Sequence, residues 1–341
     1  MGKRINLVAI DMPANEAEGF IETLCEKTGF EWKYATCVTN QRNTKLQNLY
    51  RYIMYFVYPF KLFLNRRKIA NLLAWQEFYG ILFAFYCRLF HVKKQTQLVI
   101  LTFMYTPKKG LLGRIYKWFM HYAVCNKYVD YIVCFSKEEL TYYYEEFNFT
   151  DKDICFLPVA VRKIPKYDTS ISDDKFVFTA GRSGRDFDFV IESLNNTQYH
   201  LFVADNKTTV SPAANVTIDS DVSGEDMFKI MAHSYCVVTP LKDKLKSAGH
   251  LMSLQAMQMG KPVISTDSAG MRPYVVDGCN GFFIENTKED LLSVLDKLYS
   301  DEDLYRQMSK NALDTYNQYT FSKLAERIVE LSLDKFNLTR E

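Results

Sequence analysis

The chain has 341 residues, enough for two α/β domains of ordinary size, and 48% apolar with 24% charged residues is the composition of a globular protein. The formal net charge is only +2, but fifteen Lys or Arg residues and a single acid fall between residues 41 and 128. This uneven distribution suggests that one face of one domain meets an anionic surface or ligand.

Cysteine and histidine spacings argue against a metal centre and a disulfide framework. None of the eight cysteines forms a C-x-x-C pair, and the five histidines are scattered. Buried free thiols in a reducing cytoplasm are therefore expected. The N-terminus enters a predicted strand directly, without a signal-peptide apolar region, so we expect a cytoplasmic protein.

The first predicted elements are a strand at residues 5–10, a helix at 16–28 and a second strand at 31–38. The turn between the first strand and the helix carries Asp11. A carboxylate at this place can act as a general base toward a hydroxyl group. Aspartate is also preferred at helix N-termini, and helix capping is the favoured interpretation of Asp11.

Residues 45–67 mix aromatic and aliphatic side chains with Lys and Arg, and they include Pro59. The segment is too short and too often interrupted to span a bilayer as one helix. Its composition is typical of a helix that lies in a membrane interface, although an ordinary buried helix is the alternative. The residues expected at a membrane or acceptor are Arg51, Tyr55, Tyr58, Lys61, Arg66 and Arg67, with Lys108 and Lys109 in a later turn.

Residues 71–90 form a second long apolar stretch, close in length to a transmembrane span. Gln76, Glu77 and Gly80 near its middle favour a buried or interfacial helix instead. The rest of the first half is predicted as strands at 98–104 and 131–135 and helices at 113–127 and 137–147, with Ser136 as an N-cap.

After a polar linker at residues 162–174, a strand at 175–180 ends in the turn Gly181-Arg-Ser-Gly-Arg-Asp186, which opens a helix at 187–194. A glycine turn before a helix leaves free N–H groups that suit a phosphate. Arg182 and Arg185 can grip a diphosphate bidentately, which lysine cannot do. A solvated turn without a ligand is the alternative.

A second unit of this kind follows. A strand at 236–240 leads through a basic loop and the turn Ser247-Ala-Gly249 into a helix at 250–259, and further strands follow at 262–266 and 281–284. In parallel sheets, ligands bind outside the carboxyl ends of the strands. From these residues alone, a plain βαβ unit without a ligand is an equal alternative. Other predicted elements are strands at 200–204 and 216–218, and helices at 224–232, 288–299, 301–316 and 321–336.

Residues 249–281 resemble the donor-binding half of GT-B glycosyltransferases, in particular the bacterial retaining enzymes called family 4. Two family glutamates, eight residues apart, fall on Ser247 and Gln255. Gln255 can still hydrogen-bond ribose hydroxyls, whereas Ser247 supplies no carboxylate. The residues that match the family pattern are Gln255-Ala256-Met257, Gly260, Pro262-Val263-Ile264, Ala269-Gly270, Asp277-Gly278 and Gly281-Phe282-Phe283.

The resemblance implies an α/β protein of the GT-B fold, with two Rossmann-like domains facing an interdomain cleft. The implied domains are 1–165 for the acceptor, 166–320 for the nucleotide sugar, and a C-terminal helix at 321–341 that crosses back to the first domain. By resemblance, Arg182 and Lys246 stabilise phosphate charge on the departing nucleotide, and Asp11 is the candidate base. The implied donor-binding residues are Gly181, Arg182, Arg185, Asp219, Ser247, Gly249, His250 and Gln255.

The implied activity is transfer of a sugar from a UDP- or GDP-linked donor to a glycan acceptor, expected to be lipid-linked, with retention by analogy. No metal and no cofactor beyond the nucleotide-sugar substrate is expected. The setting would be capsule, O-antigen or exopolysaccharide assembly by a peripheral protein at the inner face of the cell membrane. The alternatives are an epimerase-like or phosphorylase GT-B protein and a non-catalytic, membrane-docking partner. No nucleic-acid motif accompanies the basic excess.

Overall fold

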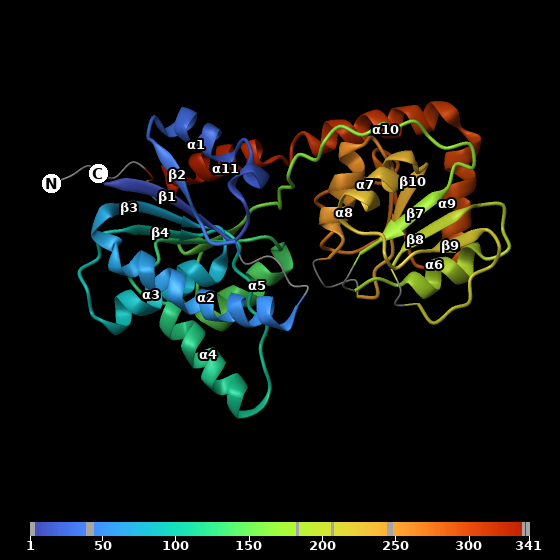
Figure 1. Cartoon of the computed structure of the whole chain (residues 1–341). Helices are drawn as coiled ribbons and strands as arrows, with labels where there is room; N and C mark the ends of the chain where they lie inside the picture. The colour runs from blue at the N-terminus through green and yellow to red at the C-terminus, as the bar shows by residue number, and fades with distance from the viewer. Residues whose placement is uncertain are drawn as a thin grey trace. The chain divides into compact units, whose positions relative to one another are not determined.

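The structure is a computed structural model that describes residues 4–38, 44–181, 184–205, 208–243, 248–335 and 338. It divides into two compact units, one of residues 1–158 with 321–341 and one of residues 159–320 (Figure 1). Each unit holds a six-stranded sheet whose described strand pairs are all parallel, with helices on both faces. This architecture confirms the predicted pair of Rossmann-like α/β domains.

The first unit has the strand order β2-β1-β3-β4-β5-β6. Helices α1 and α11 cover one face of this sheet, and α2, α3 and α4 cover the other (Figure 1). The strands are β1 (Ile5–Ile10), β2 (Trp32–Thr36), β3 (Ile69–Ala74), β4 (Gln97–Ile100), β5 (Tyr131–Cys134) and β6 (Ile154–Phe156). The helices are α1 (Phe20–Thr28), α2 (Lys45–Leu64), α3 (Glu77–Leu89), α4 (Gly110–Val124), α5 (Lys137–Phe147) and α11 (Phe321–Asp334), with short 3-10 helices at Ala14–Ala17 and Arg66–Lys68.

The prediction of one helix over residues 71–90 is wrong. Its first residues belong to β3, in which all six residues are buried, and α3 begins only at Glu77. β3 pairs with β1 on one side and β4 on the other, so the strand lies inside the sheet. A central parallel strand is apolar on both faces, and its sequence therefore looks like that of a buried helix.

The predicted helix at 16–28 is interrupted. A 3-10 helix ends at Ala17, and α1 starts only after Gly19, whose φ of +86° is incompatible with a continuous helix. The backbone turns here so that α1 lies alongside α11, and the Ser322 hydroxyl donates to the Gly19 carbonyl over 3.2 Å. The last long helix, α11, thus belongs to the first unit, although the whole second unit precedes it in the chain.

The second unit has the strand order β12-β11-β10-β7-β8-β9. The chain enters this unit at Val159, so the predicted linker at 162–174 and the expected domain boundary at 165/166 both fall inside it. The strands are β7 (Val177–Ala180), β8 (Leu201–Ala204), β9 (Val216–Ile218), β10 (Cys236–Thr239), β11 (Val263–Thr266) and β12 (Gly281–Ile284). The helices are α6 (Phe187–Leu194), α7 (Gly224–His233), α8 (His250–Gln258), α9 (Lys288–Ser300) and α10 (Glu302–Tyr316).

The strand order of each sheet defines one point at which the direction of the connections reverses. Successive connections run outward in opposite directions from the β1/β3 pair in the first sheet and from the β7/β10 pair in the second. Crossover connections are right-handed, so the helices that follow the two strands of such a pair lie on opposite faces and leave a crevice at the carboxyl ends. Ligands of open α/β sheets bind in these crevices.

Candidate active site

The exits of β7 and β10 meet at the crevice of the second sheet. The Asp186 amide donates to the Pro240 carbonyl over 3.1 Å, and the Lys242 amide donates to the Gly184 carbonyl over 2.9 Å. These bonds tie the turn after β7 to the loop after β10. The glycine-arginine turn and the loop that leads into α8 are therefore one structural site, as the two separate sequence patterns suggested.

Arg185 is packed into this site. Its Nε donates to the Ala180 carbonyl over 3.2 Å, and burial lowers the pKa of the guanidinium to about 10. The side chain passes so close to Gly181 that a Cβ there would lie 2.6 Å from Nε. A larger residue at position 181 would displace Arg185. The structure thus brings these two predicted donor-site residues together and positions one positive charge at the carboxyl end of β7.

The start of α8 faces the same crevice. The N-cap is Gly249, with φ of +95°, and a Cβ there would lie 2.7 Å from Thr239 Cγ2 and 2.9 Å from Met271 Sδ. Among the described residues no side chain caps the helix, and its first turn carries no acidic residue. The free N–H groups and the positive end of the helix dipole therefore suit an anion.

His250 is the first residue of α8 and is partly buried, with its ring 5.8 Å from the ring of Tyr274. No described residue hydrogen-bonds its Nδ1 atom. Burial, and then the positive charge of Arg185, lower the pKa of the imidazole to about 4. His250 is therefore neutral at pH 7, and the effect of Arg185 on its pKa indicates that the two side chains lie near each other.

A set of side chains that the sequence analysis missed holds the β10 exit in place. The Leu241 amide donates to Thr266 Oγ1 over 2.7 Å, and the Leu241 carbonyl accepts from Asn286 Nδ2 over 3.0 Å. Thr266 Oγ1 in turn donates to Asn286 Oδ1 over 2.6 Å. Thr266 is the last residue of β11, and Leu241 and Asn286 lie in the loops after β10 and β12. The position of Thr266 at the end of a buried strand was only a weak indication of this role, and no sequence pattern indicated Asn286.

The remaining predicted donor-site residues are less closely grouped. Asp219 follows the edge strand β9, where its amide donates to the Val203 carbonyl over 3.0 Å, and β8 separates it from β7. Gln255 lies partly buried within α8. Arg182, Lys246 and Ser247 lie outside the described residues.

The crevice of the first sheet holds Asp11, which follows β1. Its Oδ2 accepts a hydrogen bond from Gln76 Nε2, which follows β3, over 3.0 Å. Asp11 does not cap a helix, because the residue before the 3-10 helix is Pro13 and the residue before α1 is Gly19. The favoured capping interpretation is therefore wrong, and Asp11 with Gln76 forms a polar pair where ligands of such sheets bind.

Glu77, next to this pair, is a further residue that the sequence analysis did not assign to a site. Its side chain is buried, and its Oε2 accepts from the Met104 amide over 2.6 Å. Burial, with a smaller contribution from Glu139, raises the pKa of Glu77 to about 8, so it is largely protonated at pH 7. The next amide, of Tyr105, donates to the Tyr143 hydroxyl over 2.9 Å. These two bonds anchor the loop after β4.

Two helices of the first unit carry large apolar side chains that are exposed. We call the α2 face the exposed side chains of Leu46, Leu49, Tyr50, Tyr52, Ile53, Phe56, Val57, Phe60 and Leu64, and the α4 tip those of Leu111, Leu112, Ile115 and Trp118. Both helices lie on the same face of the sheet (Figure 1). The described part of the chain contains no helix with the length and apolar character needed to cross a membrane.

The predicted membrane or acceptor residues lie on and beside these helices, with one correction. Tyr58 is buried and packs on Tyr79 with ring centroids 4.9 Å apart, so it belongs to the core and cannot contact a membrane. Tyr55 is partly buried and stacks on Phe78. Arg51 lies over the Tyr52 ring, and Arg66 over Phe63. The exposed residues of this set are Lys61, Arg67, Lys108 and Lys109.

The second unit matches a known family. Residues 190–315, which include β10, α8 and the loop between them but not the turn after β7, match the family described as glycosyl transferases group 1. No curated protein sequence matches the chain.

Solved structures of the same fold cover nearly the whole chain. Sucrose-phosphate synthase from Thermosynechococcus elongatus has a TM-score of 0.64 at 12% identity, over 97% of this chain and 99% of that one. Anabaena HepE in complex with UDP has a TM-score of 0.60 at 14% identity, over 97% and 99%. WaaG, a glycosyltransferase involved in lipopolysaccharide biosynthesis, has a TM-score of 0.61 at 15% identity, over 96% and 99%.

At these identities the structural likeness concerns the fold alone, whereas the family match covers the sequence on the β10 and α8 side of the crevice. Together, the two Rossmann-like units give the chain the GT-B fold, and residues 190–315, which include β10 and α8, match the family of glycosyl transferases group 1.

Proposed function

We propose that the protein transfers a sugar from a UDP- or GDP-linked donor to a glycan acceptor carried on a polyprenyl-diphosphate lipid. The reaction takes place at the inner face of the cell membrane, in the synthesis of a bacterial surface polysaccharide. The observation that carries this proposal is the crevice of the second sheet, in which Arg185, His250 and the uncapped start of α8 converge.

The donor assignment is supported by the chemistry of that crevice. A diphosphate needs positive charge and N–H donors, and Arg185 and the α8 N-terminus supply both. Anabaena HepE has been solved with UDP and with UDP-glucose, which supports a uridine nucleotide as the first donor to test. A neutral His250 next to Arg185 adds a hydrogen-bonding group without adding a second fixed charge.

In the proposed mechanism, negative charge builds up on the nucleotide diphosphate as the bond to the sugar breaks. Arg185 and the α8 N-terminus lie at the crevice before the substrate arrives, so little reorganisation is needed as this charge develops. Arg182 and Lys246 are proposed to act with them, and stabilisation of this kind contributes several kcal/mol. We expect these protein cations to serve in place of a metal ion, so chelation with EDTA should leave the transfer rate unchanged.

The acceptor side of the proposal uses the crevice of the first sheet. Asp11 and Gln76 offer a hydrogen-bond acceptor and a donor to an acceptor hydroxyl, and Asp11 is the proposed base. Retention of the anomeric configuration is proposed by analogy with the family that the sequence resembles. Ser247 and Gln255 replace its two glutamates, so the donor is proposed to be held by altered contacts.

The membrane setting is supported by the α2 face and the α4 tip. Soluble monomers rarely expose large contiguous apolar patches, and α2 alone exposes nine large apolar side chains. Lys61 and Arg67 border the α2 face, and Lys108 and Lys109 precede the α4 tip. Apolar side chains next to basic ones are the composition of helices that lie on anionic membranes. WaaG, which has the same fold, is involved in lipopolysaccharide biosynthesis.

The deciding experiment is a transfer assay with a panel of UDP- and GDP-sugars and a lipid-diphosphate-linked glycan. Transfer from one donor, together with weaker UDP or GDP binding of Arg182→Ala in calorimetry, is the expected result. The surface variant Arg306→Ala serves as a control, because that arginine lies on α10 and its ion pairs among the described residues are with the exposed acids Glu302 and Asp303. No transfer from any donor, or unchanged nucleotide affinity of Arg182→Ala, would overturn the assignment.

A further inference from the structure

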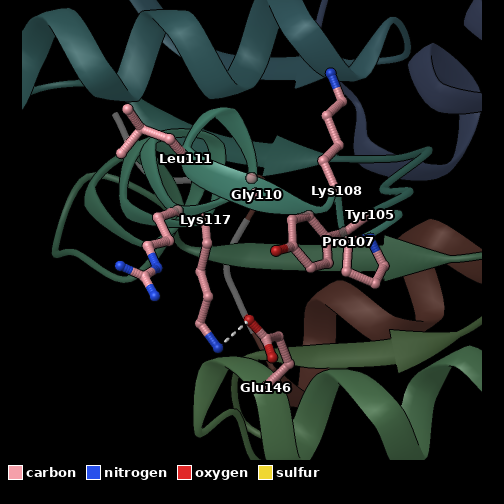
Figure 2. A pocket seen from close by; sticks show the side chains of 9 residues that line it. Tyr105, Pro107, Lys108, Gly110, Leu111, Lys117 and Glu146 are labelled. Carbon is pink, nitrogen blue, oxygen red and sulfur yellow. Dashed lines mark ion pairs between the residues drawn. The ribbon is translucent and has the colours of Figure 1, made fainter.

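A cavity of about 550 Å³ lies in the first unit, between the loop that follows β4, the first two turns of α4, and α5 (Figure 2). Tyr105 and Lys108 line it from the loop, Arg114 and Lys117 from α4, and Glu146 from α5. The loop leaves the sheet at the carboxyl end of β4, which pairs with β3. The cavity therefore begins at the same edge of the sheet as the Asp11–Gln76 pair.

The lining carries more positive than negative charge. Its single carboxylate, Glu146, is already paired, because its Oε1 lies 2.8 Å from Lys117 Nζ (Figure 2). The same Oε1 atom lies 3.4 Å from His121 Nε2. Burial on its own would raise the pKa of Glu146, but the hydrogen bonds from Lys117 and His121 hold it below its ordinary value. Arg114 is exposed and has no ion pair or hydrogen bond among the described residues. An anion would meet this arginine without competition.

The backbone adds to this positive character. α4 starts directly after Lys108 and Lys109, no side chain caps it among the described residues, and its first turn has no acid. The loop folds closely onto the helix, since a Cβ on Gly113 would lie 1.9 Å from the Lys108 carbonyl oxygen. Any side chain at this position would push the loop away from the helix and deform the cavity.

The outer surface of the same helix turns is apolar. Leu111, Leu112 and Ile115 of the α4 tip are 72%, 76% and 54% exposed. In Figure 1, this end of α4 extends away from the sheet. A free sugar nucleotide or a free phosphate would make no use of such side chains. A phosphate joined to a long hydrocarbon chain would use both features, with its charge in the cavity and its chain along the tip.

We propose that this cavity binds the phosphate of an amphiphile, with the α4 tip in contact with its hydrocarbon chain. The inference extends the proposed function, because it gives the lipid-linked acceptor a place for its diphosphate. A membrane lipid offers the same chemistry through the phosphate of its headgroup. The two sources differ in where they are met, since a short-chain diphosphate can bind from solution whereas a headgroup is met only in a bilayer.

The solution test is calorimetry with farnesyl diphosphate, a short-chain soluble probe. Arg114→Glu should weaken this binding about tenfold or more, the loss expected when a charge-assisted hydrogen bond is replaced by repulsion. Lys127→Glu is the matched control, because Lys127 is exposed just beyond the other end of α4 and does not line the cavity. It should bind the probe as the natural protein does, and farnesol, which lacks the phosphates, should bind to neither.

The membrane test is flotation of the same variants with phosphatidylcholine vesicles, with and without phosphatidylglycerol. Loss of farnesyl diphosphate binding in Arg114→Glu identifies the acceptor diphosphate as the ligand. Loss confined to phosphatidylglycerol vesicles identifies a lipid headgroup. If Arg114→Glu behaves like Lys127→Glu in both tests, the cavity is not a phosphate site and the inference is wrong.

The inference and the proposed function fail separately. UDP binding of Arg114→Glu should be unchanged, because the donor crevice lies in the other unit. If the natural protein transfers sugar and Arg114→Glu binds farnesyl diphosphate and vesicles as Lys127→Glu does, the cavity assignment is wrong and the proposed function stands. If the natural protein binds farnesyl diphosphate through Arg114 but transfers no sugar, the proposed function is wrong and the cavity assignment stands.

Discussion

His250 and Glu77 are titratable side chains that burial keeps uncharged at pH 7, one at each crevice. The pKa of His250 is lowered from 6.5 to about 4, and that of Glu77 is raised from 4.5 to about 8. Their effects on folding stability have opposite signs. When the pH falls, His250 becomes charged in the unfolded chain before it does so in the folded chain. When the pH rises, Glu77 becomes charged in the unfolded chain first. A pH profile of the natural protein alone would mix the two, so single variants are needed.

At the residue scale, we predict that His250 makes the protein less stable as the pH falls from about 6.5 to about 4. Below pH 6.5 the unfolded chain binds a proton that the folded chain does not, at a cost of up to about 3 kcal/mol in the free energy of unfolding. Urea unfolding at pH 7.5 and pH 5 should show a smaller loss for His250→Gln than for the natural protein. His200→Gln, at an exposed position, should retain the full loss. Equal losses in both variants would contradict the burial of His250.

At the element scale, the turn between β10 and α8 depends on Gly249 because of its positive φ and because its neighbours leave no room for a Cβ atom. A comparison with a second glycine separates these two effects. Gly249 and Gly278 both have positive φ, of +95° and +71°, but only Gly249 has neighbours within contact distance of an added Cβ. Gly249→Ala therefore adds steric overlap with Thr239 and Met271 to the backbone strain that both alanine variants share.

We predict that Gly249→Ala lowers the free energy of unfolding by about 1–3 kcal/mol more than Gly278→Ala. It should also weaken UDP binding, since the start of α8 must shift to relieve the overlap. Urea unfolding and calorimetry measure the two effects. Equal stability of the two variants would show that the turn relaxes without moving the helix, and UDP binding would then be preserved.

The α2 face is the second feature at this scale. Ile53→Asp with Phe56→Asp introduces charge into the exposed apolar face, where both side chains are more than half exposed, so folding should be little affected. We predict a loss of flotation with phosphatidylglycerol vesicles, because the charged face no longer partitions into the interface. Leu333→Asp is the control, since Leu333 is 80% exposed on α11, on the opposite face of the sheet. Equal flotation of the two variants would argue against α2 as a membrane contact.

At the scale of the whole molecule, the chain leaves the second unit and completes the first with α11. Phe321, its first residue, is buried and packs edge-on against Trp75 with ring centroids 4.9 Å apart. All three tryptophans, Trp32, Trp75 and Trp118, belong to the first unit. Tryptophan fluorescence therefore follows the unfolding of this unit alone.

We predict that Phe321→Ala lowers the free energy of unfolding seen by tryptophan fluorescence by about 3–5 kcal/mol, the cost of a deleted core aromatic ring. UDP affinity should be unchanged, because the donor crevice lies in the second unit. Leu333→Ala, at an exposed position of the same helix, should change neither quantity. A comparable loss of UDP binding in Phe321→Ala would show that the two units do not fold independently.

The differences between prediction and structure have common physical causes. The strand β3 was taken as part of a helix, because a strand buried on both faces lacks the alternation that distinguishes strands. The break at Gly19 follows from packing against α11, about three hundred residues away in the chain. Asp11 was assigned to a cap because capping is a local rule, whereas its partner Gln76 is brought close only by the pairing of β1 with β3.

The sequence by itself predicted buried strands, helices and phosphate-suited turns, because short runs of residues carry the patterns of these elements. The two Rossmann-like domains were implied by the resemblance of residues 249–281 to GT-B glycosyltransferases. The sequence also determined that the first half of the chain is basic and aromatic. Only the tertiary structure decided which side chains share a crevice, since strand order joins residues far apart in the chain. It brought Arg185 to His250, Asp11 to Gln76, and Arg114 to a cavity beside exposed leucines. Charge and burial at a site depend on such neighbours, which no local pattern records.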